Sequence, residues 1–276
     1  MIGSKSVDFV PGRSAAVRWR TGLFLLILHA LPVSALIIGT KPLDWIVLAI
    51  IFPFGGIGVG VALHRYFTHH SFQTSRGFQF ALGLMASIAF GDPICFAGKH
   101  RLHHQYSDTR NDVHTPLHGA WQCWIGSLID CGYSDDQLRE RAQDLWRYPE
   151  LRWLHRYRLL PGLTLALIAF LIGGYTTLAI GFCLMPVILM HQSSAVNYFC
   201  HRYGTQRFDV GDDSRNNALV AILTLGEGWH NNHHRYPQCA HAGFYWWEID
   251  MFYWAIWVFE KLGLIWAVKG VPVRAA

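Results

Sequence analysis

The chain has 276 residues, of which 52% are hydrophobic and only 15% are charged. Soluble domains carry about 25% charged residues, so this composition argues against a soluble protein and favours an integral membrane protein. The formal net charge of +5 does not require a nucleic-acid partner, because basic cytosolic flanks are typical of membrane proteins. We therefore expect membrane lipid, and no nucleic acid, among its partners.

Three stretches without Asp, Glu, Lys or Arg predict where the chain crosses the membrane. Residues 21–40 and 45–63 are each long enough for one crossing of about 20 residues. Residues 159–201 are long enough for two crossings, and Gly-Gly-Tyr-Thr-Thr at 173–177 predicts a turn between them. The predicted spans, which form two hairpins, are 22–40, 44–63, 159–177 and 179–201. The first could instead be a signal peptide, but it is longer than a signal core and lacks a convincing cleavage site.

The basic residues predict the orientation of these spans. Four of the 23 Lys and Arg precede the first span, eleven lie between the second and third, seven follow the fourth, and Lys41 lies in the first connection. The positive-inside rule then places both termini and the middle segment in the cytosol. We expect one domain, 1–276: an all-α integral membrane protein with four transmembrane helices and a cytosolic helical cap from 64–158 and 202–276. Within the cap, 251–268 is expected to lie on the membrane surface.

The chain contains sixteen histidines, and most of them are grouped on the predicted cytosolic side of the membrane. Two groups share the pattern HxxHH, whose positions i, i+3 and i+4 lie on one helix face, so we expect each motif to converge on one point. His64 and His69 are five residues apart, so a bend or a helix end should bring them together. Asn197 and His201 are four apart and share a helix face. The candidate metal ligands are His64, His69, His100, His103, His104, His201, His230, His233 and His234.

The number of clustered histidines bears on the metal. One zinc ion takes about four protein ligands, which is too few for eight or nine imidazoles. Imidazole suits zinc, copper, iron or nickel, so ligand type alone does not choose the metal. Two metal ions with four or five imidazoles each fit the count. His29 and His191 lie inside predicted spans and outside this constellation; they are either functional or hydrogen-bonded between helices.

At these residues the chain resembles the membrane-bound fatty acid desaturases, specifically the acyl-CoA Δ9-desaturase branch. The resemblance is carried by GVALHRYFTH at 60–69, HRLHHQYSD at 100–108 and GEGWHNNHH at 226–234, and extends over about 45–265. It implies a four-span helical fold with two iron ions in the cytosolic cap. The nine histidines would be the ligands, and Asn197 would hold a metal through water. It also implies an O2-dependent reaction that inserts a cis double bond, of Δ9 type, into a long saturated acyl chain.

Acceptors for the imidazole N–H groups are expected next to the ligands, because such contacts fix the tautomer. Glu227, Asp108 and Asp112 are the candidates. Electrons are expected from a separate carrier of the ferredoxin, rubredoxin or cytochrome b5 type, because the sequence contains no HPGG haem motif.

The substrate tunnel is predicted from the resemblance and from helix geometry. Phe96 stands where many relatives have Trp at the bend of the acyl tunnel. A tunnel running toward the second span would bring Phe52 and Leu48 near the methyl end of the chain, although Phe52 could equally face lipid. Leu117 and His118 replace a basic pair of animal acyl-CoA enzymes, so CoA, acyl-carrier protein and intact lipid all stay open as headgroups.

Two other functions are compatible with parts of this pattern. A histidine-rich membrane hydroxylase would begin with the same hydrogen abstraction but leave oxygen in its product. A metal transporter or sensor would place polar residues midway across the spans, whereas the histidines cluster at the predicted cytosolic ends.

Overall fold

The computed structural model describes residues 12–271, so the two ends of the predicted single domain, 1–11 and 272–276, lie outside the described residues. Within this range the fold is mostly helical. Its strands are the short antiparallel pair β1 (Gln73–Thr74) and β2 (Ile265–Trp266). The chain is therefore of the all-α class.

Three helices in the described part of the chain are long and apolar enough to cross a membrane, and the first two are joined by a short connection. The first is α1 (Ala15–Ile38), which ends at Gly39 with a φ of 115°. The second consists of α2 (Pro42–Gly56) and the π-helix η1 (Ile57–Thr68). The chain is accordingly a membrane protein, with the predicted spans 22–40 and 44–63 falling on these two helices.

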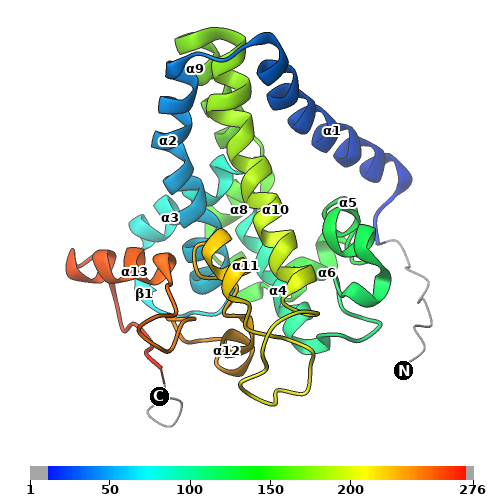
Figure 1. The fold of residues 1–276 in the computed structure, drawn as a ribbon, viewed down its shortest axis with the longest axis vertical. Coiled ribbons are helices and arrows are strands. Elements are labelled where there is room, and N and C mark those ends of the chain that lie inside the picture. The colour runs from blue at the N-terminus through cyan, green and yellow to red at the C-terminus, as the bar shows by residue number, and fades with distance from the viewer. Residues whose placement is uncertain (1–11, 272–276) are drawn as a thin grey trace.

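The third candidate is 40 residues long, about twice the length that a bilayer requires. It contains α9 (Leu160–Thr176), the π-helix η4 (Thr177–Cys183) and α10 (Leu184–Phe199). The helix breaks at Gly174, whose φ of 71° and ψ of −158° only glycine adopts readily. Figure 1 shows the chain reversing direction at the top of the molecule, near the label of α9. The glycine break lies within the turn predicted at 173–177.

Buried polar contacts join the two helical pairs at this same end. Asp44, in the first turn of α2, accepts a hydrogen bond from the backbone N–H of Lys41 and so caps its own helix. Its other carboxylate oxygen accepts from the Thr177 hydroxyl at 2.6 Å. A carboxylate among apolar helices needs such partners, so Asp44 fixes the two turns against each other.

The remaining helices are shorter. Before α9 they are α3 (Arg76–Ile88), α4 (Pro93–Tyr106), η2 (Pro116–His118), η3 (Gln122–Gly126), α5 (Ser127–Ile129), α6 (Asp135–Glu140), α7 (Gln143–Trp146) and α8 (Pro149–Arg156). After α10 they are α11 (Ala218–Leu223), α12 (His230–Arg235) and α13 (Met251–Lys261). The apolar pair α3 and α4 is bent by 83° at its break. The short helices gather at one end of the long ones, and α13 lies across the direction of α2 (Figure 1).

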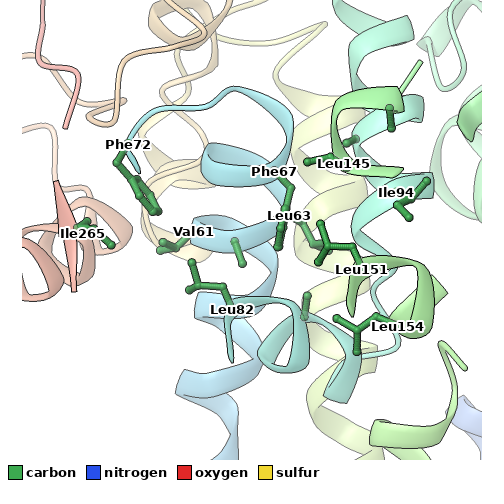
Figure 2. Packing of buried hydrophobic residues seen from close by; sticks show 14 of the residues in the cluster. Val61, Leu63, Phe67, Phe72, Leu82, Ile94, Leu145, Leu151, Leu154 and Ile265 are labelled. Atoms are coloured by element: carbon green, nitrogen blue, oxygen red, sulfur yellow. The ribbon is translucent and has the colours of Figure 1, made fainter. Parts of the chain in front are cut away.

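The main hydrophobic core fixes η1 and α4, the two elements that carry the first two histidine motifs. Figure 2 shows Leu63 and Phe67 of η1 packed near Leu151 of α8 and Ile94 of α4, all of them buried. On another face of η1 there is space only for glycine, because a Cβ at Gly58 would lie 2.3 Å from the Met85 carbonyl oxygen. Close packing on both faces leaves η1 little freedom to shift.

Candidate metal centre

The first histidine pair depends on the unusual winding of η1. A π-helix pairs residues five apart, so His64 and His69 come close although an α-helix would separate them. Their ring centroids are 5.1 Å apart, and His69 is the residue that ends the helix. The sequence predicts a bend or a helix end between these two histidines. The structure shows that π winding also brings them together, which the sequence did not indicate.

All nine candidate ligands lie together, as two groups of four and a ninth ring beside the first group. Within each group one nitrogen of every ring lies within 4.8 Å of the others. The groups are His64, His69, His100 and His233, and His103, His201, His230 and His234. The ninth ring is His104, whose Nε2 lies 3.2 Å from that of His100 and 3.0 Å from that of His233. The nine histidines belong to η1 and the residue that ends it, to α4, to α12, and to the turn at His201 that follows α10.

The expectation that each HxxHH motif converges on one point is wrong. In the first motif His100 and His104 stay together, while His103 belongs to the other group. In the second motif His230 shares a group with His234, and His233 crosses over. The reason is that successive α-helical residues are about 100° apart, so positions i+3 and i+4 point to opposite sides of position i. Each motif thus contributes to both groups.

The structure places each of the three predicted carboxylates against a histidine Nδ1. Glu227 lies 2.5 Å from His64, Asp112 lies 2.9 Å from His103, and Asp108 lies 2.8 Å from His201. A carboxylate only accepts, so each Nδ1 donates and each Nε2 keeps its lone pair. The rings are thereby fixed with their lone pairs facing into the two groups.

Sequence reasoning missed a fourth carboxylate, Asp212, which lies 2.6 Å from Nδ1 of His234. Asp212 belongs to the loop between α10 and α11, more than twenty residues before its partner in the chain. The only sequence signal was an acidic pair, Asp212 and Asp213, in a loop that follows a candidate ligand. Such pairs are common on surfaces, so the contact could not be inferred from it.

The arrangement of these lone pairs provides a test of metal binding. His103 and His234 both donate through Nδ1, yet their Nε2 atoms are only 3.3 Å apart. Two lone pairs at this distance repel each other. A proton on both rings would set two N–H groups against each other, and burial disfavours a proton on one ring alone, because it lowers the pKa of His234 to about 4. A cation between them removes the conflict. The donor set therefore fits a metal, and nitrogen-rich sites of this kind suit iron among others.

Burial keeps the free rings in the form that binds metal. Desolvation, followed by neighbouring imidazoles, lowers the pKa of His230 and His233 well below the usual value. Burial also lowers the pKa of His234 to about 4, even though Asp212 acts in the opposite direction. For Glu227, burial would raise the pKa, but His64 and Arg65 outweigh it and lower the value to about 2. These shifts leave neutral imidazoles that face the metal position and ionised carboxylates behind them.

Comparison of the sequence with known proteins identifies the family of the chain. The fatty acid desaturase family profile matches residues 42–266. The chain belongs to the fatty acid desaturase family. It is 35% identical to the sn-2 palmitoyl-lipid 9-desaturase of Nostoc sp. (strain 36), covering 96% of this chain and 95% of that protein. It is 34% identical to the sn-1 stearoyl-lipid 9-desaturase of Anabaena variabilis, covering 92% and 94%. A 34% match to the icosanoyl-CoA 5-desaturase of Limnanthes douglasii covers 91% and 72%.

The predicted family and its Δ9 branch are thus confirmed, and the chain is an oxidoreductase that desaturates acyl chains. The relatives act on acyl chains joined to lipid or to CoA, as their names state. The substrate of this desaturase is accordingly a lipid-type molecule that carries an acyl chain.

A cavity of about 630 Å³ reaches the histidines of this desaturase. Its lining includes His64, His100 and His230, together with Asn197 and Phe96. The Phe96 ring is stacked near that of His100, with centroids 5.8 Å apart. Asn197 and Phe96 therefore both border the cavity beside the candidate ligands, and the roles predicted for them stay predictions.

The lining of the cavity differs from that of the predicted tunnel. It includes Phe24 and Leu28 of α1 and Leu189 of α10, and from the second helix it includes Gly60 and Leu63 of η1. Among the described residues, the lining does not include Phe52 or Leu48. Both pack against a hydrophobic cluster that contains Ala169 and Phe182 together with Leu28 and Leu189 of the cavity wall. The sequence indicated a depth along the second helix, but the side of that helix that faces the cavity could not be read from it.

Proposed function

We propose that this desaturase inserts a cis double bond, of Δ9 type, into a long saturated acyl chain at a centre of two iron ions. The carrying observation is that two groups of inward-facing histidine nitrogens border one largely apolar cavity. Overall, two hydrogens leave adjacent methylenes, and O2, two electrons and two protons complete the formation of two water molecules. Bound iron supplies the redox chemistry that activates O2.

The proposed ligands are divided by the two groups. His64, His69, His100, His104 and His233 would hold one iron, and His103, His201, His230 and His234 would hold the other. Asn197 borders the same cavity and is proposed to hold a metal through water. Glu227, Asp108 and Asp112 orient three of the rings, and Asp212 orients a fourth.

The other residues of the site bind the chain, orient it and exclude water. Apolar side chains such as Leu63, Leu28 and Leu189 line the path of the methylenes. Phe96, stacked near His100, limits the position of the chain where it passes the candidate ligands. Confinement of this kind brings a chosen pair of methylenes to the reacting position and holds them there.

The headgroup is proposed to be that of a membrane lipid. The two relatives that match over more than nine-tenths of both chains are named as lipid desaturases. Leu117, where animal acyl-CoA enzymes have a basic residue, is exposed and supplies no charge for CoA phosphates. Arg20 and Lys99 line the cavity and suit a phosphate of either origin, so CoA and acyl-carrier protein are the competing headgroups to test.

The proposed topology has four spans, because the third candidate helix is broken into two arms at Gly174. α1, α2 with η1, α9, and η4 with α10 would each cross once, and the remaining elements, 64–158 and 202–276, form the cap. The distribution of Lys and Arg supports a cytosolic cap and cytosolic termini. α13 exposes Trp254 and Trp257, which suits a helix on the membrane surface. A separate ferredoxin, rubredoxin or cytochrome b5-type protein would deliver electrons to the cytosolic side.

Expression in a host that lacks unsaturated fatty acids tests the proposal. Mass spectrometry of the lipid, CoA and carrier-protein fractions should reveal a new Δ9 monounsaturated chain first in intact lipids. A hydroxylated chain as the main product would overturn desaturation in favour of the hydroxylase alternative. Unsaturation that appears first on CoA would overturn the proposed headgroup while leaving the reaction intact.

A further inference from the structure

Two histidines outside the metal centre join α1 to α10. Nε2 of His29 lies 3.1 Å from Nε2 of His191. The indole Nε1 of Trp124, in η3, lies 2.8 Å from Nδ1 of His191. At the other end of the series, Nδ1 of His29 lies 2.6 Å from the Leu25 carbonyl oxygen. The four groups, here called the histidine tie, form a continuous series from Trp124 to the backbone of α1.

Chemistry fixes the direction of every hydrogen bond in the tie. The indole N–H of Trp124 can only donate, so Nδ1 of His191 accepts. Neutral His191 then carries its proton on Nε2 and donates it to Nε2 of His29. The proton of His29 is left on Nδ1, which donates to the Leu25 carbonyl. All three bonds are satisfied by two neutral rings in one tautomeric arrangement.

The tie lies behind the walls of the cavity. Leu25 and Leu28 of α1, and Met190 of α10, line the cavity, whereas His29 and His191 do not. Elsewhere α1 packs loosely, because Leu28, Pro32 and Ala35 are its only buried residues. In an apolar surrounding, polar groups have no water to replace their partners, so such a series holds two helices together.

We propose that the histidine tie sets the separation of α1 from α10 and thereby the width of the acyl cavity. His29 and His191 are then positioning residues that determine specificity without touching the substrate. The inference rests on the proposed function in one respect, namely that the cavity holds the acyl chain. The position of the tie behind the walls means that it can be broken without changing the lining or the candidate ligands.

The test compares three variants of the full-length protein in detergent or lipid. His191→Leu removes the tie, because it replaces the imidazole with an apolar side chain of similar size. His191→Gln keeps it, because an amide oxygen can accept from Trp124 while its NH2 group donates to His29. Tyr175→Phe is the matched control, since it removes a hydrogen bond between Ser34 of α1 and α9 outside the cavity.

The readouts are substrate choice, iron content and helix separation. A straight saturated chain and a methyl-branched chain of equal length compete for each protein. We expect His191→Leu to lose about tenfold of the preference for the straight chain, the discrimination that one methyl-sized group gives in an apolar pocket. The other two variants should keep the wild-type preference, and iron content should be the same in all. One spin label is placed at exposed Leu23 of α1 and the other at exposed Ile222 of α11, a helix that contacts α10. The distance between the labels should increase only in His191→Leu.

Wild-type preference and an unchanged label distance in folded His191→Leu would overturn the inference. If that variant does not fold, His29→Leu, which removes the same hydrogen bond between α1 and α10 from the α1 side, carries the same comparison. If the wild type desaturates neither chain, the proposed function has failed. The label distance then still decides whether the tie holds α1 to α10.

Discussion

Nine histidines and four carboxylates are crowded into the interior at one end of the molecule, whereas α1 exposes much of its surface. In the crowded region each ring is held by several partners, as His103 is by Asp112 and by the rings around it. α1, by contrast, is hydrogen-bonded to α10 midway along its length through the histidine tie. The first arrangement suits a centre that must not move, and the second makes the position of the α1 wall depend on the histidine tie.

The largest effect is expected from the centre itself. His201→Ala should abolish turnover, because it removes a proposed ligand and takes from Asp108 its imidazole partner. His70→Ala should retain most of the activity, since the His70 side chain is half exposed and contacts Arg101 and Asp144 instead of the two groups. Turnover of a saturated chain measures both. An inactive His70→Ala beside an active His69→Ala would show that the wrong member of the first motif was chosen.

Metal content tests whether the crowded region is built around two ions. Active protein should contain two irons per chain, and a chelator should lower both activity and Tm, because the facing Nε2 lone pairs of His103 and His234 then repel each other. Metal analysis and thermal unfolding measure these effects. One iron per active chain, or Glu227 as a direct ligand, would contradict the prediction. Zinc in an overproduced sample would not, because zinc outcompetes Fe²⁺ at nitrogen sites.

The carboxylates behind the rings should matter less than the rings. Asp212→Asn replaces the acceptor of His234 Nδ1 with a neutral amide and should lower metal affinity or activity by about 10–100-fold. Asp213→Asn is the matched control, since its side chain is exposed in the same loop. Iron titration together with turnover separates an effect on binding from an effect on rate. Equal behaviour of the two variants would remove Asp212 from the centre.

Packing around η1 sharpens the comparison without touching a ligand. A Cβ at Gly60 would lie 2.2 Å from the Phe252 ring, so Gly60→Ala should destabilise the fold by about 1–3 kcal/mol. Gly77→Ala in α3 meets nothing within 4 Å and should be harmless. Unfolding of both variants under the same conditions gives the difference. A stable Gly60→Ala would show that η1 can shift more than its packing indicates.

The smallest effect concerns the far end of the acyl chain. Phe52 packs outside the cavity, so Phe52→Ala should leave chain-length preference unchanged. Leu28→Ala, on the α1 wall, should instead admit longer or bulkier chains. A ladder of saturated substrates offered to both variants measures the preference. A shift toward longer chains in Phe52→Ala would restore the tunnel direction that the sequence suggested.

The sequence by itself determined where the apolar helices lie and which residue types gather at their ends. Long uncharged runs and a Gly-Gly turn are local signals, so 22–40, 44–63 and the break near Gly174 could be read directly. Histidine spacing is also local, and it indicated nine candidate ligands before any geometry was known. Residue chemistry then suggested acceptors for the rings, including Glu227, Asp108 and Asp112.

Tertiary structure alone decided how these parts meet. The division of each HxxHH motif between two groups depends on the direction of rings on packed helices, and so does the contact of Asp212 with His234. η1 packs closely against α3, α4 and α13, and its π winding could not be read from helix propensity. The side of η1 that faces the cavity, and the pairing of His29 with His191, depend on residues far apart in the chain. Spacing along one helix specifies a face, but only packing specifies what that face meets.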